Sequence, residues 1–127
     1  MKYGFSKTVD LSFESAIEKV TAELKKEGFG VLTTIDVKET MKNKLNVDFP
    51  KYKILGACNP PLAHQALMSD DQIGLLLPCN VIVYEKDNQT HVSIFDPMLI
   101  PRIIENDGMN EMAESVKNKL ERVLMAI

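Results

Sequence analysis

Cysteine and histidine, the side chains best suited to nucleophilic or metal chemistry, are scarce in this sequence, which has two of each. Cys58 ends an apolar run and is followed directly by Asn59, Pro60 and Pro61. Asn is a good helix N-cap and Pro fits the first helical position, so a helix should begin here. The unpaired amides of a helix start favour a thiolate and can hold an anion, although the two prolines lack N–H groups. We therefore expect Cys58 and Asn59 to contribute to a ligand-binding site; the alternative is that Cys58 is a small core residue.

The second cysteine, Cys79, precedes another apolar run. If this run and the one ending at Cys58 form neighbouring antiparallel strands, the two thiols could meet at one edge of the sheet. Together with His64, on the first turns of the predicted helix, they would supply three ligands for a metal such as zinc. Alternatively, they form a redox pair with Cys58 as the nucleophile and Cys79 as the resolving partner. Two unrelated core cysteines would give the same spacing.

Asp96 stands before Pro97 at the end of a predicted strand. An aspartate in this position usually organises the turn by accepting hydrogen bonds from nearby backbone. It could also line a pocket at the strand ends, so we include Asp96 among the candidate ligand-binding residues. His91, inside the same predicted strand, is expected to be a surface or half-buried residue rather than a ligand.

Several classes of function are disfavoured by the sequence. It has no glycine-rich phosphate loop, no His-Glu-x-x-His run, no Cys-x-x-Cys pair and no Gly-x-Ser-x-Gly turn. The 15 basic residues are outnumbered by 18 acidic ones, a formal net charge of -3, which argues against binding to nucleic acids or anionic membranes.

The sequence also bears on location in the cell. Lys7 and Asp10 interrupt the apolar core that a secretory signal needs, and the most apolar stretch, residues 73–84, is too short to span a membrane. We therefore expect a cytoplasmic protein, in which thiols stay reduced and a structural disulfide is not expected.

The hydrophobic pattern predicts alternating strands and helices. Strands are predicted over residues 2–9, 31–35, 52–58, 76–84 and 90–96, the last two forming a hairpin. Helices are predicted after the capping residues Ser12, Asp36 and Asn59, and from Met109 to Leu124. Residues 97–104 are expected to be irregular or briefly helical.

The resulting order, β-α-β-α-β-α-β-β-α, predicts an α+β fold over a single domain, residues 1–127. We expect a two-layer α/β sandwich with a mixed or largely antiparallel five-stranded sheet and helices on one face. Because side chains alternate along a strand, some apolar residues must lie on the uncovered face, which favours a homodimer.

Five segments carry a family resemblance: residues 7–14 (KTVDLSFE), 27–38 (EGFGVLTTIDVK), 55–60 (LGACNP), 74–81 (GLLLPCNV) and 96–97 (DP). In this combination they resemble the domain-of-unknown-function 302 family of small bacterial and archaeal proteins, over nearly the whole chain. The resemblance implies a compact two-layer α/β domain that commonly stands alone. It implies no established activity, and both cysteines fall within the shared segments.

Three functions are consistent with these observations. The leading hypothesis is a non-enzymatic cytoplasmic module that binds a small molecule or a metal ion. The second is a thiol-dependent redox or detoxification enzyme with Cys58 as its nucleophile. The third is a structural dimer module without a ligand.

Overall fold

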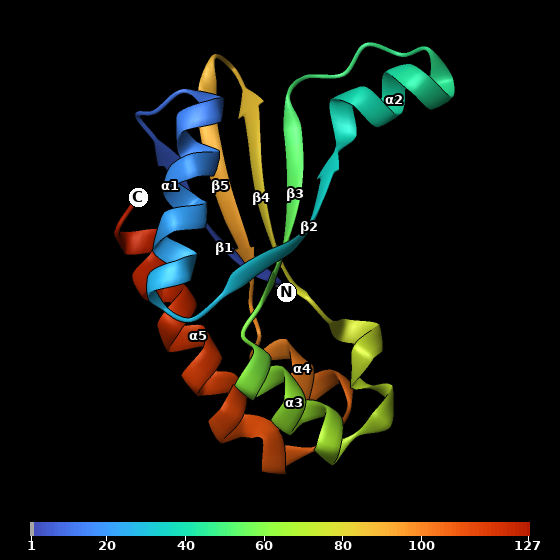
Figure 1. Cartoon of the computed structure of the whole chain (residues 1–127), viewed down its shortest axis with the longest axis vertical. Helices are drawn as coiled ribbons and strands as arrows, with labels where there is room; N and C mark the ends of the chain where they lie inside the picture. Colours follow the sequence, from blue (N-terminus) through green and yellow to red (C-terminus); the bar gives the residue numbers. More distant parts are fainter. Residues whose placement is uncertain (1) are drawn as a thin grey trace.

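The computed structural model describes residues 2–127, which form one five-stranded sheet in the spatial order β1-β5-β4-β3-β2 (Figure 1). The strands are β1 (Gly4–Val9), β2 (Gly30–Asp36), β3 (Tyr52–Cys58), β4 (Cys79–Lys86) and β5 (Gln89–Phe95). Every neighbouring pair is antiparallel. The structure therefore confirms the predicted α+β class with a five-stranded, largely antiparallel sheet.

Two long helices, α1 (Phe13–Lys26) and α5 (Asn110–Met125), pack together and cover one face of the sheet (Figure 1). The hydroxyl of Ser12 accepts the N–H of Ser15 at 3.1 Å and begins α1, as the sequence predicts. The core between helices and sheet includes Val20, Leu24 and Leu120, all fully buried. This is the helix layer of a two-layer sandwich.

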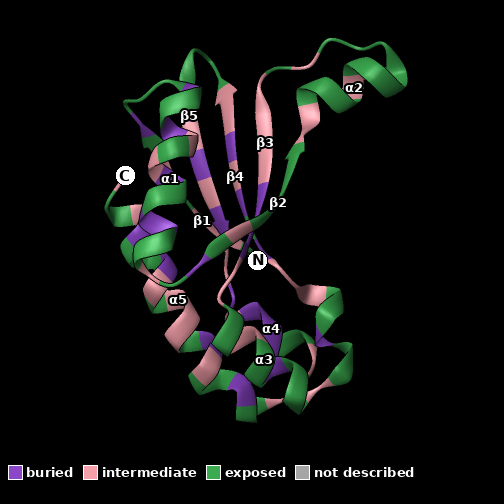
Figure 2. Ribbon diagram, in the orientation of Figure 1, coloured by how far each residue is buried: buried purple, intermediate pink, exposed green. Residues whose placement is uncertain are grey.

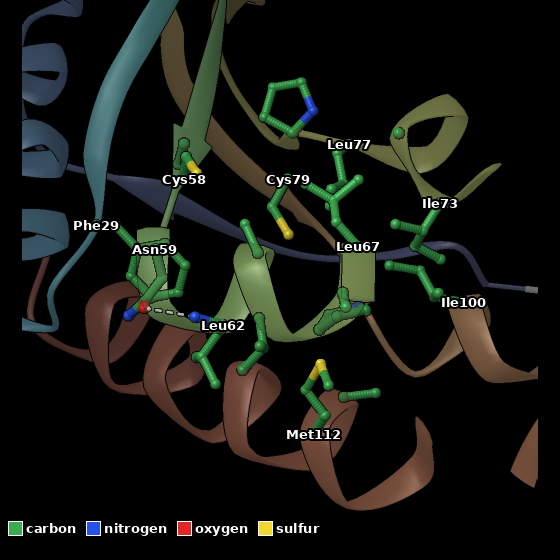
Figure 3. A pocket seen from close by; sticks show the side chains of 18 of the residues that line it. Phe29, Cys58, Asn59, Leu62, Leu67, Ile73, Leu77, Cys79, Ile100 and Met112 are labelled. Atoms are coloured by element: carbon green, nitrogen blue, oxygen red, sulfur yellow. Dashed lines mark hydrogen bonds between the residues drawn. The ribbon is translucent and has the colours of Figure 1, made fainter. Parts of the chain in front are cut away.

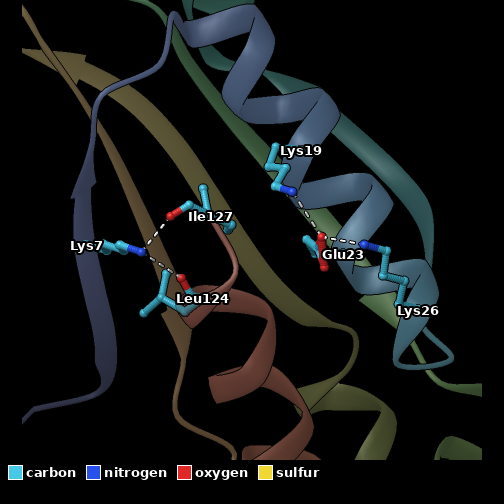
Figure 4. Close-up of polar contacts among 6 residues, drawn as sticks. All are labelled: Lys7, Lys19, Glu23, Lys26, Leu124 and Ile127. Carbon is cyan, nitrogen blue, oxygen red and sulfur yellow. Dashed lines mark hydrogen bonds and ion pairs between the residues drawn. The ribbon is translucent and has the colours of Figure 1, made fainter.

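The end of α5 is tied to the edge strand β1 by a single lysine (Figure 4). Lys7 Nζ donates to the carbonyl oxygen of Ile127 at 2.5 Å and lies 3.4 Å from that of Leu124. Leu124 belongs to the last turn of α5 and Ile127 follows the end of the helix, where few backbone N–H groups remain to pair with the carbonyls. The lysine therefore both satisfies the helix end and fixes α5 across the sheet.

Short helices gather at one end of the sheet and form what we call the helical lobe (Figure 1). It contains α3 (Pro60–Ser69), α4 (Leu99–Ile103) and the 3-10 turns Asp71–Leu76 and Asp107–Met109, and it packs against the start of α5. Its small core comprises Ala66, Ile73, Ile100 and Met109. The predicted brief helix after Pro97 is present as α4.

The predicted hairpin is present, but its first strand begins later than expected. Leu76 ends a 3-10 turn whose start is capped by Asp70, and β4 begins at Cys79. Pro78 has no N–H to donate to a sheet, so the apolar run before it packs into the helical lobe instead.

The other face of the sheet has no helix over it, and its apolar residues are partly exposed (Figure 2). The Tyr84 ring stacks on the rings of its two cross-strand neighbours. Its centroid lies 5.3 Å from that of Tyr52 and 5.0 Å from that of His91. Helix α2 (Val37–Leu45) projects away from the sheet and contains no buried residue. Its start is capped as predicted, because Asp36 Oδ1 accepts the N–H of Glu39 at 3.0 Å.

Over residues 2–127, none of the helices is both long enough and apolar enough to cross a membrane.

Candidate functional site

An apolar pocket of about 380 Å³ lies where β3 and β4 meet the helical lobe and α5 (Figure 3). Its walls are almost wholly hydrocarbon and include the side chains of Phe29, Leu32, Ile73, Ile100 and Met112. The full lining comprises Phe29, Leu32, Thr33, Ala57, Cys58, Asn59, Leu62, Ala63, Ala66, Leu67, Ile73, Gly74, Leu77, Pro78, Cys79, Pro97, Ile100, Met109, Met112, Ala113 and Val116.

Cys79 lies on the sheet wall of this pocket, at the first position of β4. Its side chain belongs to the main core and is 7% exposed. Burial, with a smaller contribution from the neighbouring Cys58, raises the pKa of the Cys79 thiol to about 11. Cys79 is therefore a protonated thiol at neutral pH.

Cys58 lies in the same pocket, at the last position of β3, and is only partly buried. The strands β3 and β4 are antiparallel neighbours with Ala57 opposite Cys79, as the sequence interpretation required. Cys58 is thus diagonal to Cys79 across the two strands. The structure brings the two cysteines to one pocket, and both are free thiols.

Asn59 has a structural role at the edge of the pocket. Its Oδ1 accepts the N–H of Leu62 at 3.4 Å and caps α3, and its Nδ2 donates to the carbonyl of Glu27 at 3.4 Å. The predicted helix start is therefore correct, with Pro60 at the beginning of the helix. The amide also joins α3 to the loop after α1, which fixes the helical lobe against the sandwich.

His64 does not join the cysteines. It lies on the exposed side of α3, whereas Leu62, Ala63 and Ala66 of the same helix line the pocket. Within the part of the chain that the structure describes, no three His, Cys, Asp or Glu side chains come together as a metal-ligand set. The zinc site predicted from Cys58, Cys79 and His64 is therefore not assembled, because α3 packs against the end of the sheet with His64 on its exposed side.

Asp96 also lies outside the pocket lining. Its Oδ1 accepts the N–H of Met98 at 3.0 Å, and its Oδ2 forms a 3.0 Å ion pair with Lys117 of α5. Asp96 thus organises the turn after β5 and holds α5 against it, which is the structural alternative that the sequence allowed. Its proposed role as a ligand-binding residue gains no support from this position.

Most of the pocket residues were not candidates at the sequence level. Four of them come from four separate elements, and within its own segment each has the pattern of an ordinary core residue: Ile73, Ile100, Met109 and Met112. The only sequence signal is the apolar stripe at the start of the last helix, and such a stripe does not distinguish a pocket wall from a filled core.

The arrangement of the pocket determines what it can do chemically. Its polar groups are few: the Thr33 hydroxyl, the Asn59 amide and the two thiols. Neither His64 nor Asp96 is placed to act as a general base in it. The pocket is suited to enclosing an apolar molecule, and its most reactive atoms are the sulfurs of Cys58 and Cys79, beside the thioethers of Met109 and Met112.

Comparisons with known proteins agree on one family. The family model described as "Domain of unknown function DUF302" matches residues 5–127. The crystal structure of an uncharacterised conserved DUF302 protein from Bacillus stearothermophilus is similar to this chain, with a TM-score of 0.93 and 28% sequence identity. That match covers 99% of this chain and 98% of the other. No curated protein matches the sequence.

Proposed function

The chain belongs to the DUF302 family, whose description assigns no function, and from the pocket we propose that this protein binds a small apolar molecule without transforming it. The observation that supports the proposal is the nearly all-hydrocarbon pocket of about 380 Å³ beside the sheet end. Ligand-binding pockets commonly have volumes of roughly 300–1,000 Å³ and are lined mainly by apolar side chains, with a few polar groups for orientation. The Asn59 amide and the Thr33 hydroxyl would fill that orienting role here.

The surroundings of the pocket support access for a ligand. Leu32 and Leu67 line the pocket and are 68% and 41% exposed, so its apolar wall continues to the surface. Met68 and Leu75, in the helical lobe close to Leu67 and Gly74, are more exposed still. An exposed apolar patch next to a concave apolar site is typical of a binding surface.

A thiol-dependent enzyme is the second candidate, and the observation in its favour is that both cysteines line the pocket. Cys58 is partly exposed, as a nucleophile must be. The resolving step is less well supported, because the high pKa of Cys79 leaves it as a thiol at neutral pH and thiols are poor nucleophiles. We therefore favour binding over thiol chemistry.

The test uses an uncharged apolar fluorophore, N-phenyl-1-naphthylamine, titrated into the protein. Ala63 lines the pocket, and an Ala63→Phe substitution would fill it; Gln65, two residues away on α3, faces solvent, and Gln65→Phe adds a phenyl group outside the pocket. We expect saturable fluorescence enhancement with the wild type and with Gln65→Phe. Binding to Ala63→Phe should be weaker by at least about tenfold, a loss of roughly 1.4 kcal/mol.

Two outcomes would reject apolar binding. One is a wild type that produces no saturable enhancement, which would favour the ligand-free structural module instead. The other is an Ala63→Phe variant that folds, by circular dichroism and thermal melting, and binds the probe as well as the wild type does.

The proposal also places the protein in the cytoplasm, where Cys58 and Cys79 would remain reduced. A homodimer is part of the same proposal, since the uncovered sheet face and α2 leave apolar side chains exposed.

A further inference from the structure

The lining of the pocket carries no charge. Over the described residues 2–127, no Asp, Glu, Lys, Arg or His side chain belongs to it. Its inner wall is buried hydrocarbon, with Phe29, Ile73 and Met109 only 3%, 1% and 4% exposed. The thiol of Cys79, whose sulfur is directed into the pocket in Figure 3, is a weak donor and a weak acceptor. A charged group placed here would lose its water without gaining a partner, which costs far more than burying an uncharged group.

The start of α3, at the edge of the pocket, has no backbone amide left for an anion. A helix start usually binds anions through its unpaired N–H groups. Here Pro60 and Pro61 have no N–H, and the N–H of Leu62 is bonded to the side chain of Asn59. The next N–H, that of Ala63, donates to the Asn59 carbonyl at 2.9 Å. The anion site that a helix start would otherwise offer is therefore not formed.

The lysine nearest to the lining in sequence is already paired. Lys117 follows Val116, a lining residue of α5, and it is the only lysine or arginine directly beside a lining residue in the sequence. Its Nζ lies 3.0 Å from Asp96 Oδ2. Since this carboxylate already offsets its charge, Lys117 is not available to pair with a carboxylate of a ligand.

The helical lobe around the pocket is acidic. Its two segments, residues 59–78 and 97–109, contain the basic Arg102 and four acidic side chains, so their formal charge equals the net charge of the whole chain, -3. The acidic residues are Asp70, Asp71, Glu105 and Asp107. Charge of one sign concentrated around a site lowers the local concentration of ligands of the same sign. The field of the lobe therefore disfavours an anionic ligand, in addition to the cost of burying its charge.

The volume of the pocket sets the size of the ligand. A dry apolar cavity of roughly 150 Å³ holds one benzene ring. This pocket has a volume of about 380 Å³. By that ratio it accommodates about 15 carbon atoms, which corresponds to a medium-length chain or two fused rings with substituents.

We propose that the ligand of the pocket is an uncharged lipophile of about 10–15 carbon atoms with no more than one neutral polar group, and that the matching carboxylate is rejected. Alcohols, ketones and hydrocarbons of this size belong to the class, whereas ionised fatty acids do not. This inference rests on the proposed function, because it names the class of apolar molecule that the pocket binds.

The test compares 1-decanol with decanoate at pH 7, two ligands with the same number of carbon atoms that differ in charge. Each is titrated into the wild-type protein with N-phenyl-1-naphthylamine already bound, and the loss of fluorescence gives its affinity. We expect 1-decanol to displace the fluorophore and decanoate to bind at least about tenfold more weakly.

A lysine at the mouth of the pocket should change this selectivity. Leu32 lines the pocket and is 68% exposed, so Leu32→Lys adds an ammonium group at the mouth without burying it. We expect its affinity for decanoate to rise by about threefold to fivefold, the strength of an exposed ion pair, with little change for 1-decanol. Leu75→Lys is the matched control, because Leu75 is 82% exposed and outside the lining. It adds the same charge to the lobe and should change neither affinity.

The outcomes separate this inference from the proposed function. A wild type that binds the fluorophore, but from which decanoate displaces it as readily as 1-decanol does, retains apolar binding and overturns the uncharged class. The class is also overturned if 1-decanol does not displace the bound fluorophore, or if Leu32→Lys binds decanoate no better than Leu75→Lys does. A wild type that does not bind the fluorophore at all rejects the proposed function, and the ligand class with it.

Discussion

A methyl group added at Gly56 has no free space to occupy. A Cβ built there would overlap Thr33 Oγ1 of β2 and lie 2.8 Å from Pro78 Cγ, closer than Cβ contacts in real structures. Both atoms belong to short, stiff side chains, a β-branched threonine and a proline ring, which cannot swing far aside. We therefore expect Gly56→Ala to reduce the free energy of unfolding by about 1–3 kcal/mol. Urea denaturation measures this change.

The matched control is Gly74→Ala. A Cβ at Gly74 would meet no atom within 4 Å, so the substitution should leave the unfolding midpoint close to that of the wild type. A Gly56→Ala variant as stable as Gly74→Ala would contradict the close packing of Pro78, the residue before Cys79, against β3.

Glu23 provides a pH-dependent contribution to stability. Its side chain is 9% exposed, and its carboxylate accepts hydrogen bonds from Lys26 at 2.8 Å and Lys19 at 3.1 Å (Figure 4). These bonds lower the pKa of Glu23 from its ordinary 4.5, that of Lys26 contributing most. Because the folded-state pKa lies below the unfolded one, the stabilisation is present above about pH 4.5 and is lost as the pH falls through the folded-state value.

We therefore expect Glu23→Gln to melt at a lower temperature than the wild type at pH 7, with the difference shrinking below pH 4.5. Thermal melts across this range check it. Glu18→Gln is the control, since Glu18 is exposed and no ion pair to it is present in residues 2–127. A difference that stayed constant down to pH 3 would contradict the charge-based origin.

Individual residue roles could be predicted from the sequence where they depend on local chain geometry. The caps at Ser12, Asp36 and Asn59 were correct, because a cap involves atoms only a few residues apart. His64 was placed wrongly in a metal set, since its distance from Cys58 depends on the angle between α3 and the sheet. No local pattern encodes that angle.

At the scale of elements, Asp96 connects the end of β5 to the start of α4 and to α5. One carboxylate oxygen holds the turn at the N–H of Met98, and the other holds Lys117 of α5, itself 6.0 Å from the ring centre of Phe5. We expect Asp96→Ala to reduce the free energy of unfolding by about 1–3 kcal/mol, because a half-buried turn amide and an ammonium group both lose their partner. Lys117→Ala removes only the partly exposed ion pair and should cost no more than about 1 kcal/mol.

Urea denaturation of Asp96→Ala and Lys117→Ala separates the loss of the turn hydrogen bond from the loss of the ion pair. Titration of both variants with N-phenyl-1-naphthylamine tests the pocket. Probe affinity should be unchanged in Asp96→Ala, since Asp96 does not line the pocket. A variant that kept full stability but lost probe binding would restore Asp96 as a ligand-binding residue.

The elements themselves were largely predictable, and the exceptions have physical causes. Strands such as β3 and helices such as α1 follow periodic apolar patterns, which depend only on the geometry of the element. The start of β4 was placed too early because residues 76–78 are as apolar as the strand. They lie in the helical lobe because Pro78 cannot join the ladder, a constraint that an apolar run alone does not reveal.

For the whole molecule, the layer arrangement followed from the order of elements, whereas the pocket did not. A hairpin at the end of an alternating β-α series already indicates an antiparallel sheet with helices on one face. The pocket forms where five helical segments meet the ends of β3 and β4, so its shape depends on how imperfectly these parts fill the space between them. Packing of this kind is a property of the folded chain, and no segment of the sequence contains it.

The uncovered face of the sheet leads to a prediction about assembly. Ile35 on the edge strand β2 is 49% exposed, and Leu45 on the projecting α2 is 65% exposed. Natural proteins protect exposed edges with lysine or proline, and β2 contains neither. We therefore expect a homodimer in which this surface of each copy covers that of the other, as a two-fold axis requires.

Size-exclusion chromatography with light scattering measures the mass. The wild type should elute as a dimer of two 14.3 kDa chains at micromolar concentration. The double substitution Ile35→Lys with Leu45→Lys should convert the dimer to a monomer, because the dimer would bury two lysines of each copy against those of the other. Leu75→Lys, at a position 82% exposed on the helical lobe, adds the same charge elsewhere and should remain dimeric. A wild type that is monomeric, or a lysine pair that leaves the dimer intact, would show that β2 and α2 are solvent-facing and that the apolar side chains on them have no partner.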